Sequence, residues 1–155
     1  MSRFFSGSIA VCISLLAFAL PACGADPRVV ISTKSGAERA IRVEIADTPP
    51  KRELGLQYRR ELGDDQGMLF LFPAESVQTF WMKNTPISLD MIFIGSDRKI
   101  VGIVQRAVPY STATLSVGMP SQFVLEIKGG LASAKGIEVG NSVRFEGISP
   151  ERIKE

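Results

Sequence analysis

The sequence predicts a single, mainly β domain, an antiparallel β-sandwich or barrel-like fold with one or two short helices, preceded by a signal peptide. Two observations predict the fold class. Short apolar or β-branched stretches follow one another along the chain, separated by turns rich in proline and glycine, as is typical of antiparallel β folds. Fourteen glycines and nine prolines in 155 residues also favour many turns over a helical bundle.

Composition narrows the classes of function. The 18 basic and 16 acidic side chains nearly balance, so we expect no nucleic-acid partner. The chain has no histidine, which excludes Ser-His-Asp and Cys-His catalysis and histidine metal sites. The sequence assigns no catalytic residue, metal or cofactor.

Residues 1–25 have the features of a secretory signal peptide. Arg3 is followed by an uncharged stretch over 4–20 and by small residues up to Ala25, before the acidic Asp26. We therefore expect residues 26–155 to form one extracytoplasmic domain, periplasmic or secreted, with no transmembrane span in the mature chain. An uncleaved membrane anchor is the rival interpretation, which the polar residues and Pro21 in this stretch weaken.

The cleavage site is open between two positions. Cleavage after Ala25 leaves a small-x-small pattern at its end, whereas 20–23 resembles a lipoprotein box that would place a lipid anchor on Cys23. Cys12 and Cys23 are the two cysteines of the chain. The mature domain therefore has no cysteine pair to bridge, and packing alone must stabilise it.

The first elements are predicted from periodicity. The run 29–31 and the alternating segment 39–46 predict two strands around a turn at 34–36, with Ile41, Val43 and Ile45 on one face. A helix is expected to begin at 47–50 and to run through Leu62, because Leu54, Tyr58 and Leu62 form an apolar stripe. Gly55 within it indicates close packing against a neighbour. Further strands are expected at 68–72, 77–82, 89–94, 100–108, 123–127 and 143–145.

The segment Phe-Trp-Met-Lys-Asn-Thr-Pro at 80–86, continuing to Ile94, is the most distinctive in the chain. With Arg-Glu-Leu-Gly-Leu-Gln at 52–57, Gly-Met-Leu-Phe at 67–70 and the glycines at 129, 130, 136 and 140, it closely resembles the signature of an uncharacterised bacterial and archaeal family, domain of unknown function 192. Asn141 departs from that pattern, which more often has Asp. The resemblance implies a compact, mainly β fold with a short helix, often behind an export signal, but no catalytic residue, substrate or cofactor.

A polar cluster is predicted around the 80–90 loop. If the strand ending at Lys83 pairs with the one starting at Asp90, the two side chains form a cross-strand ion pair. Asn84 and Thr85 lie in the loop between them. Glu126 is a second carboxylate in an apolar run, and Arg52 and Arg59 are available as its counter-ions.

These residues have two interpretations. In the functional one Lys83, Asn84, Asp90, Glu126 and an arginine gather around one pocket; in the structural one they form separate ion pairs, and Asn84 and Thr85 bond the loop backbone. Trp81, the single tryptophan, is either a stacking surface for a ligand or a core residue.

Two metal hypotheses are weaker than their structural alternatives. Met82 facing Met91 could bind Cu(I), but gap filling in the core is the more common role of such a pair. The loop at Asp64 and Asp65 lacks the alternating ligands of a calcium site and is expected to be a solvated turn.

Three functions remain open. The first is an extracytoplasmic binding or accessory module for an unknown small ligand or envelope component, contacting Trp81, Lys83, Asn84 and Asp90. The second is a small hydrolase of envelope polysaccharide that uses Asp90 and Glu126 as acid and base. The third is a structural partner in an envelope assembly, which a large exposed apolar patch would favour.

Overall fold

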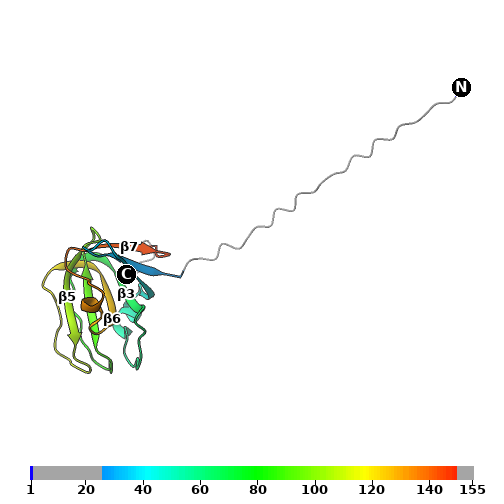
Figure 1. The fold of residues 1–155 in the computed structure, drawn as a ribbon. Coiled ribbons are helices and arrows are strands. Elements are labelled where there is room, and N and C mark those ends of the chain that lie inside the picture. The colour runs from blue at the N-terminus through cyan, green and yellow to red at the C-terminus, as the bar shows by residue number, and fades with distance from the viewer. Residues whose placement is uncertain (2–25, 150–155) are drawn as a thin grey trace.

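The computed structural model describes Met1 and residues 26–149. Residues 2–25, which hold almost all of the predicted signal peptide and its Cys23, lie outside the described residues, as do residues 150–155. The described part folds around one curled sheet of seven strands with two short helices (Figure 1). The prediction of a mainly β fold is confirmed, and the single curled sheet corresponds to the barrel-like alternative rather than to a sandwich.

The elements are β1 (Arg28–Ser32), β2 (Glu38–Ala46), α1 (Pro49–Leu54), β3 (Gln66–Val77), β4 (Leu89–Ile94), β5 (Ile100–Ala107), β6 (Pro120–Lys128), α2 (Leu131–Ala134) and β7 (Ser142–Glu146).

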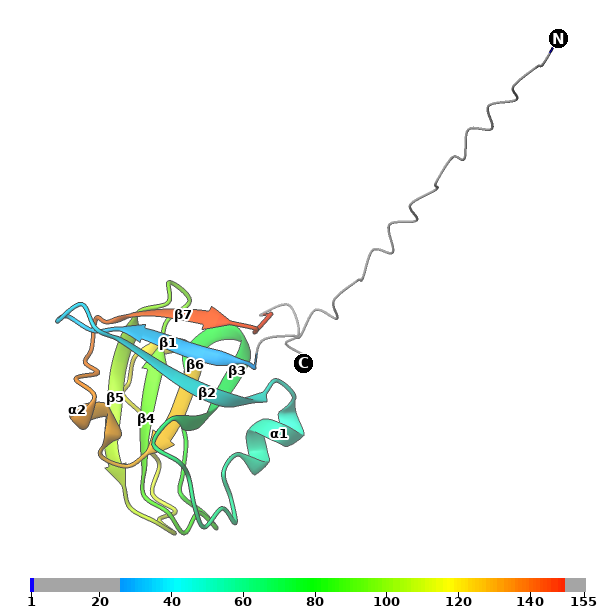
Figure 2. The ribbon, with the colours of Figure 1, turned by 45° about the vertical axis from the view of Figure 1, so that its right-hand side comes forward.

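The order of strands in the sheet is β5-β4-β6-β3-β2-β1-β7. Near one end of the two edge strands, a bridge between Lys99 and Ser142 brings the edges together and curls the sheet. In the view of Figure 2, α1 lies beside β2 and α2 lies at the other side of the sheet. No helix within residues 26–149 has the length and apolar character needed to cross a membrane.

The predicted first hairpin is confirmed. β1 and β2 pair antiparallel with Val29 opposite Ile41. Ile41 and Val43 are buried, whereas Arg42 and Glu44 between them are exposed, as the period-two alternation of this segment requires.

The expectation of a wholly antiparallel sheet is wrong at one pair, because β2 and β3 run parallel, with Val43 opposite Gly67. Parallel neighbours need a crossover connection rather than a hairpin. Residues 47–65, which include α1, supply that crossover and lie beside the sheet. This connection forms one wall of the site described below.

The sheet buries side chains on both faces. One cluster draws residues from all seven strands and from α2, so it fills the inside of the curl. A second cluster, the outer core, lies on the other face of β3, β4 and β6, where the α1 crossover and the 79–89 segment cover it. Its fully buried members include Phe70, Met82, Met91 and Phe93. Successive residues along a central strand such as β3 therefore point alternately into the inside of the curl and into the outer core.

The first helix is shorter than predicted. α1 ends at Leu54, and Gly55 follows with φ +48°, a backbone conformation that ends the helix. A Cβ at position 55 would lie 3.2 Å from Cζ of Phe70, so the close packing expected at this glycine is confirmed. The predicted apolar stripe is wrong, because Leu54 and Tyr58 are 54% and 69% exposed.

The predicted strand at 77–82 is also wrong. β3 continues through Pro73 to Val77, and the following segment forms a single bridge, between Phe80 and Leu115. β4 pairs instead with β5 and β6. Since the 79–83 segment does not pair with β4, the inferred register of Lys83 opposite Asp90 and Met82 opposite Met91 does not form.

Candidate functional site

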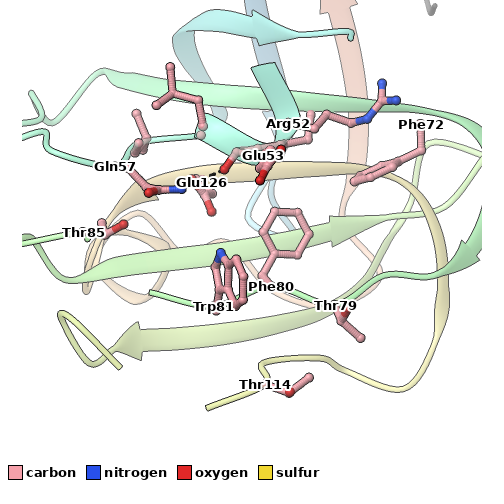
Figure 3. A pocket seen from close by; sticks show the side chains of 14 residues that line it. Arg52, Glu53, Gln57, Phe72, Thr79, Phe80, Trp81, Thr85, Thr114 and Glu126 are labelled. Carbon is pink, nitrogen blue, oxygen red and sulfur yellow. Dashed lines mark hydrogen bonds between the residues drawn. The ribbon is translucent and has the colours of Figure 1, made fainter. Parts of the chain in front are cut away.

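A cavity of about 480 Å³ lies between the α1 crossover, β3, β6 and the segment around Trp81. Figure 3 shows its lining: Trp81 and Phe80 stand on one side, and Glu53 and Gln57 face them from the crossover. A cavity of this size suits a small organic molecule. The side chains that line it, beside the stretch 52–57, are Phe70, Phe72, Thr79, Phe80, Trp81, Thr85, Thr114 and Glu126.

Trp81 and Phe80 are neighbours in the chain and both line the cavity, but they differ in their surroundings. The Phe80 ring packs edge-on against Phe70 and Phe93, with ring centroids 5.1 and 5.9 Å apart. Trp81 is 49% exposed, so the interpretation of Trp81 as a core residue is wrong. The ammonium of Lys83 lies 5.4 Å from the centre of the Trp81 ring, a cation–π contact.

Glu126 provides the buried carboxyl group of the cavity. It lies on β6 between Met68 of β3 and Met91 of β4, its cross-strand neighbours. The residue is 4% exposed, and Figure 3 shows its side chain directed into the space near Gln57 and Trp81. Burial raises the pKa of the Glu126 carboxyl to about 8, because low-polarity surroundings disfavour the charged form. The carboxyl group is therefore mainly protonated at pH 7.

The counter-ions proposed for Glu126 are engaged elsewhere. Nη1 of Arg52 donates to the carbonyl oxygen of Leu71 at 2.9 Å, and the guanidinium lies 5.5 Å from the centre of the Phe72 ring. Arg59 forms an exposed ion pair with Glu44 at 2.6 Å and does not line the cavity. Among the described residues, no side chain makes a hydrogen bond or ion pair with Glu126.

Asn84 and Thr85 hold the Trp81 segment in place. The side-chain amide of Asn84 donates to Oε1 of Gln57 at 3.1 Å and to the hydroxyl of Tyr58 at 3.0 Å, and the Tyr58 N–H donates to the Asn84 carbonyl at 2.7 Å. The hydroxyl of Thr85 donates to the backbone oxygen of Lys83 at 3.2 Å, as the structural interpretation predicts for Thr85. The bonds of Asn84 to Gln57 and Tyr58 join the two walls of the cavity.

Asp90 has a structural role and does not pair with Lys83. It is fully buried and accepts hydrogen bonds from three backbone N–H groups, those of Arg106 at 2.7 Å, Gly130 at 2.9 Å and Ala132 at 2.8 Å. Ile127 is its cross-strand partner on β6, so Asp90 faces the inside of the curl and Glu126 faces the outer core. The two carboxyl groups are thus not arranged to flank one sugar ring.

The structure therefore brings together part of the predicted cluster. Trp81, Thr85, Glu126 and Arg52 line one cavity, Lys83 and Asn84 support it, and Asp90 and Arg59 lie elsewhere. The cavity residues that the sequence did not single out are Glu53, Gln57, Phe70, Phe72, Thr79, Phe80 and Thr114. Alternation along β3 places Phe70 and Phe72 on the same face as Met68. This pattern could have indicated from the sequence that both phenylalanines line the cavity. No local pattern marks Thr114, which the bridge at Leu115 brings to the site.

The residues of the two metal hypotheses have structural partners. Met82 and Met91 are fully buried in the outer core. Asp64 pairs with Lys128 at 2.9 Å, and Asp65 pairs with Arg42 at 2.8 Å, both at the surface. Within residues 26–149, no three Cys, Asp or Glu side chains gather closely enough to hold a metal ion.

Comparison with known proteins identifies relatives of the whole fold. A crystal structure of a protein of unknown function from Novosphingobium aromaticivorans DSM 12444 is 44% identical, covers 76% of this chain and 83% of its own, and has a TM-score of 0.73. A putative transcription regulator from Sinorhizobium meliloti 1021 is 40% identical, covers 79% of this chain and 95% of its own, and has a TM-score of 0.76. No curated protein matches.

The sequence model of domain of unknown function 192 (DUF192), described as "Uncharacterized ACR", matches residues 30–145. This range spans β1 to β7 and includes every residue that lines the cavity. The resemblance stated from the 80–86 segment is thereby confirmed, and the chain belongs to the DUF192 family.

Proposed function

We propose that this protein is an extracytoplasmic binding module whose ligand is a small organic molecule held in the cavity beside Trp81. The observation that supports it is the combination of an exposed tryptophan and a buried carboxyl group without a partner in one cavity. A polar group of a buried residue that has no protein partner is stabilised when water or a ligand bonds with it. A ligand that bonds with Glu126 would give this side chain a role that folding alone does not explain.

The aromatic lining suits a ligand with an apolar or flat body. Trp81 offers a half-exposed ring to the cavity, and the rings of Phe72 and Phe80 also line it. Large aromatic side chains provide much of the binding energy at such sites. The Glu126 carboxyl then selects among ligands by the polar group that each presents.

Trp81 is a built-in probe, because it is the one tryptophan of the chain. The test is fluorescence titration of the purified domain with a panel of small amines, sugars and carboxylic acids. At least one compound class should change Trp81 emission saturably, and calorimetry should show at least tenfold weaker binding to Trp81→Ala. Tyr110→Asn is the matched control, because Tyr110 is exposed, lies outside the cavity and has φ +61°, which Asn tolerates.

Two results would contradict the proposal. The first is that no panel compound perturbs Trp81 at millimolar concentration. The second is that the bound compounds have equal affinity for wild type, Trp81→Ala and Glu126→Gln, which would place their site elsewhere.

The extracytoplasmic location rests on residues 1–25 of the sequence. Mass spectrometry of the protein expressed in a bacterial host should find a mature chain that begins at Asp26, or one that begins at an acylated Cys23. A full-length, unprocessed chain in the cytoplasmic fraction would contradict export.

A further inference from the structure

The acidic and basic side chains around the cavity, with Glu126 able to ionise beside a cation, favour a positive ligand. Glu53 and Glu126 both line it, and Arg52 is its one basic lining residue. Arg52 is engaged with the Leu71 carbonyl and with the Phe72 ring, and Figure 3 shows its guanidinium directed away from Glu126. An anionic ligand would therefore meet two carboxyl groups without a free cation beside the buried one.

The aromatic rings that line the cavity also favour a positive ligand. The face of an aromatic ring is electronegative and attracts cations, most strongly for tryptophan. The Trp81 ring already attracts the Lys83 ammonium at 5.4 Å. Phe72 and Phe80 add two further rings to the lining, 6.3 Å apart and nearly perpendicular. Several rings around a carboxyl group resemble the aromatic cages that bind quaternary ammonium ions.

We propose that the cavity binds an organic ammonium ion, with its charged nitrogen between the Glu126 carboxyl and the rings of Phe80 and Trp81. The inference rests on the proposed function and deepens it by naming the class of ligand. A cation would also give Glu126 an ion-pair partner, because it supplies the counter-charge that no described side chain provides.

Binding of a cation should be coupled to loss of a proton. The cross-strand neighbours of Glu126 are the uncharged Met68 on β3 and Met91 on β4. The charged side chains that line the same cavity are Arg52 and Glu53 of α1, and the Lys83 ammonium lies at the Trp81 ring. Burial raises the pKa of the Glu126 carboxyl itself to about 8. A fixed cation favours the ionised carboxylate, so its affinity should rise about tenfold per pH unit below pH 8 and level off above it.

The experiment compares choline with its uncharged isostere 3,3-dimethyl-1-butanol by calorimetry between pH 6 and pH 9. Neither probe changes charge through Glu126's titration range. We expect choline to bind more tightly than the isostere at pH 9 by at least tenfold, with its affinity falling toward pH 6. Titrations at pH 7 in two buffers of different ionisation enthalpy should show release of about one proton per choline bound.

Glu126→Gln isolates the role of the carboxylate. Its choline affinity at pH 9 should fall at least tenfold and become independent of pH, whereas the control Glu138→Gln, a substitution of an exposed glutamate paired with Lys34, should behave as wild type. Equal binding of choline and the isostere, or choline affinity that does not change with pH, would overturn the inference.

The outcomes separate the two proposals. If neutral or acidic panel compounds bind beside Trp81 and choline does not, the ligand class is wrong and the binding function stands. If neither choline, the isostere nor any panel compound perturbs Trp81, the binding function itself is wrong.

Discussion

Asp90 and Glu126 lie on adjacent strands one residue out of register, and their side chains enter opposite faces of the sheet. Ile127 is opposite Asp90, and Met91 is opposite Glu126. One carboxyl group accepts three backbone hydrogen bonds inside the curl, and the other has no partner in the outer cavity. Two acidic residues in neighbouring apolar strands thus have two different roles.

The first prediction concerns Asp90. Asp90→Ala leaves the N–H groups of Arg106, Gly130 and Ala132 without their acceptor, and each loss destabilises by about 1–3 kcal/mol. We expect a decrease of at least about 3 kcal/mol in the free energy of unfolding, measured by urea denaturation. Asp64→Ala, at an exposed ion pair, should change the midpoint far less. An Asp90 variant of unchanged stability that loses ligand binding would contradict the structural role.

The second prediction is that stability falls as pH rises through the titration of Glu126. The pKa of Glu126 in the folded protein, about 8, lies above the ordinary glutamate value of 4.5, so between these values the unfolded chain releases a proton that the folded protein retains. Ionisation therefore favours unfolding, and the free energy of unfolding falls by about 1.4 kcal/mol per pH unit from near pH 5 to near pH 8. Below pH 4.5 both states are protonated and this contribution is constant.

The measurement is the urea midpoint of wild type and Glu126→Gln between pH 5 and pH 9. Glu126→Gln should remove most of the downward slope and be more stable than wild type at pH 8, while Glu138→Gln retains the slope. Parallel pH curves for wild type and Glu126→Gln would show that another group titrates.

The parts of the fold that could be predicted depend on local pattern. The alternation through Ile41 and Val43 fixes the face of β2, and the apolar run 89–94 coincides with β4. The end of α1 could not be predicted from spacing alone, since Leu54 and Tyr58 keep a helical period although Gly55 has positive φ. Local pattern therefore fixes strand faces better than the ends of a short helix.

Residues of the site could be predicted where the role of a residue depends on its type and on its neighbours in the sequence. A carboxylate between Leu125 and Ile127 indicates a buried group, and Glu126 is one. The partners of Asp90 could not be predicted, because their N–H groups come from positions 16, 40 and 42 residues away in the chain. Only the tertiary fold brings such backbone donors together.

The third prediction concerns Gly55, which lies against Phe70 in the wall of the cavity. Gly55→Ala adds a Cβ 3.2 Å from the Phe70 ring at a backbone φ of +48°, and strain of this kind destabilises by about 1–3 kcal/mol. The control is Gly36→Ala, also at positive φ but with no atom within 4 Å of the new Cβ. Thermal denaturation should show the larger loss for Gly55→Ala; equal losses would mean that contact with Phe70 contributes nothing.

The last prediction separates Phe80 from Trp81. Phe80 contacts three other phenylalanine rings, so Phe80→Ala should decrease the free energy of unfolding by about 3 kcal/mol through the cavity it creates. Trp81 is half exposed, so Trp81→Ala should decrease it by less than about 1 kcal/mol while abolishing ligand binding. Urea denaturation and calorimetric titration of both variants provide the check. A strongly destabilised Trp81→Ala would indicate that the indole supports the fold, and the assignment of Trp81 to ligand contact would then have to be abandoned.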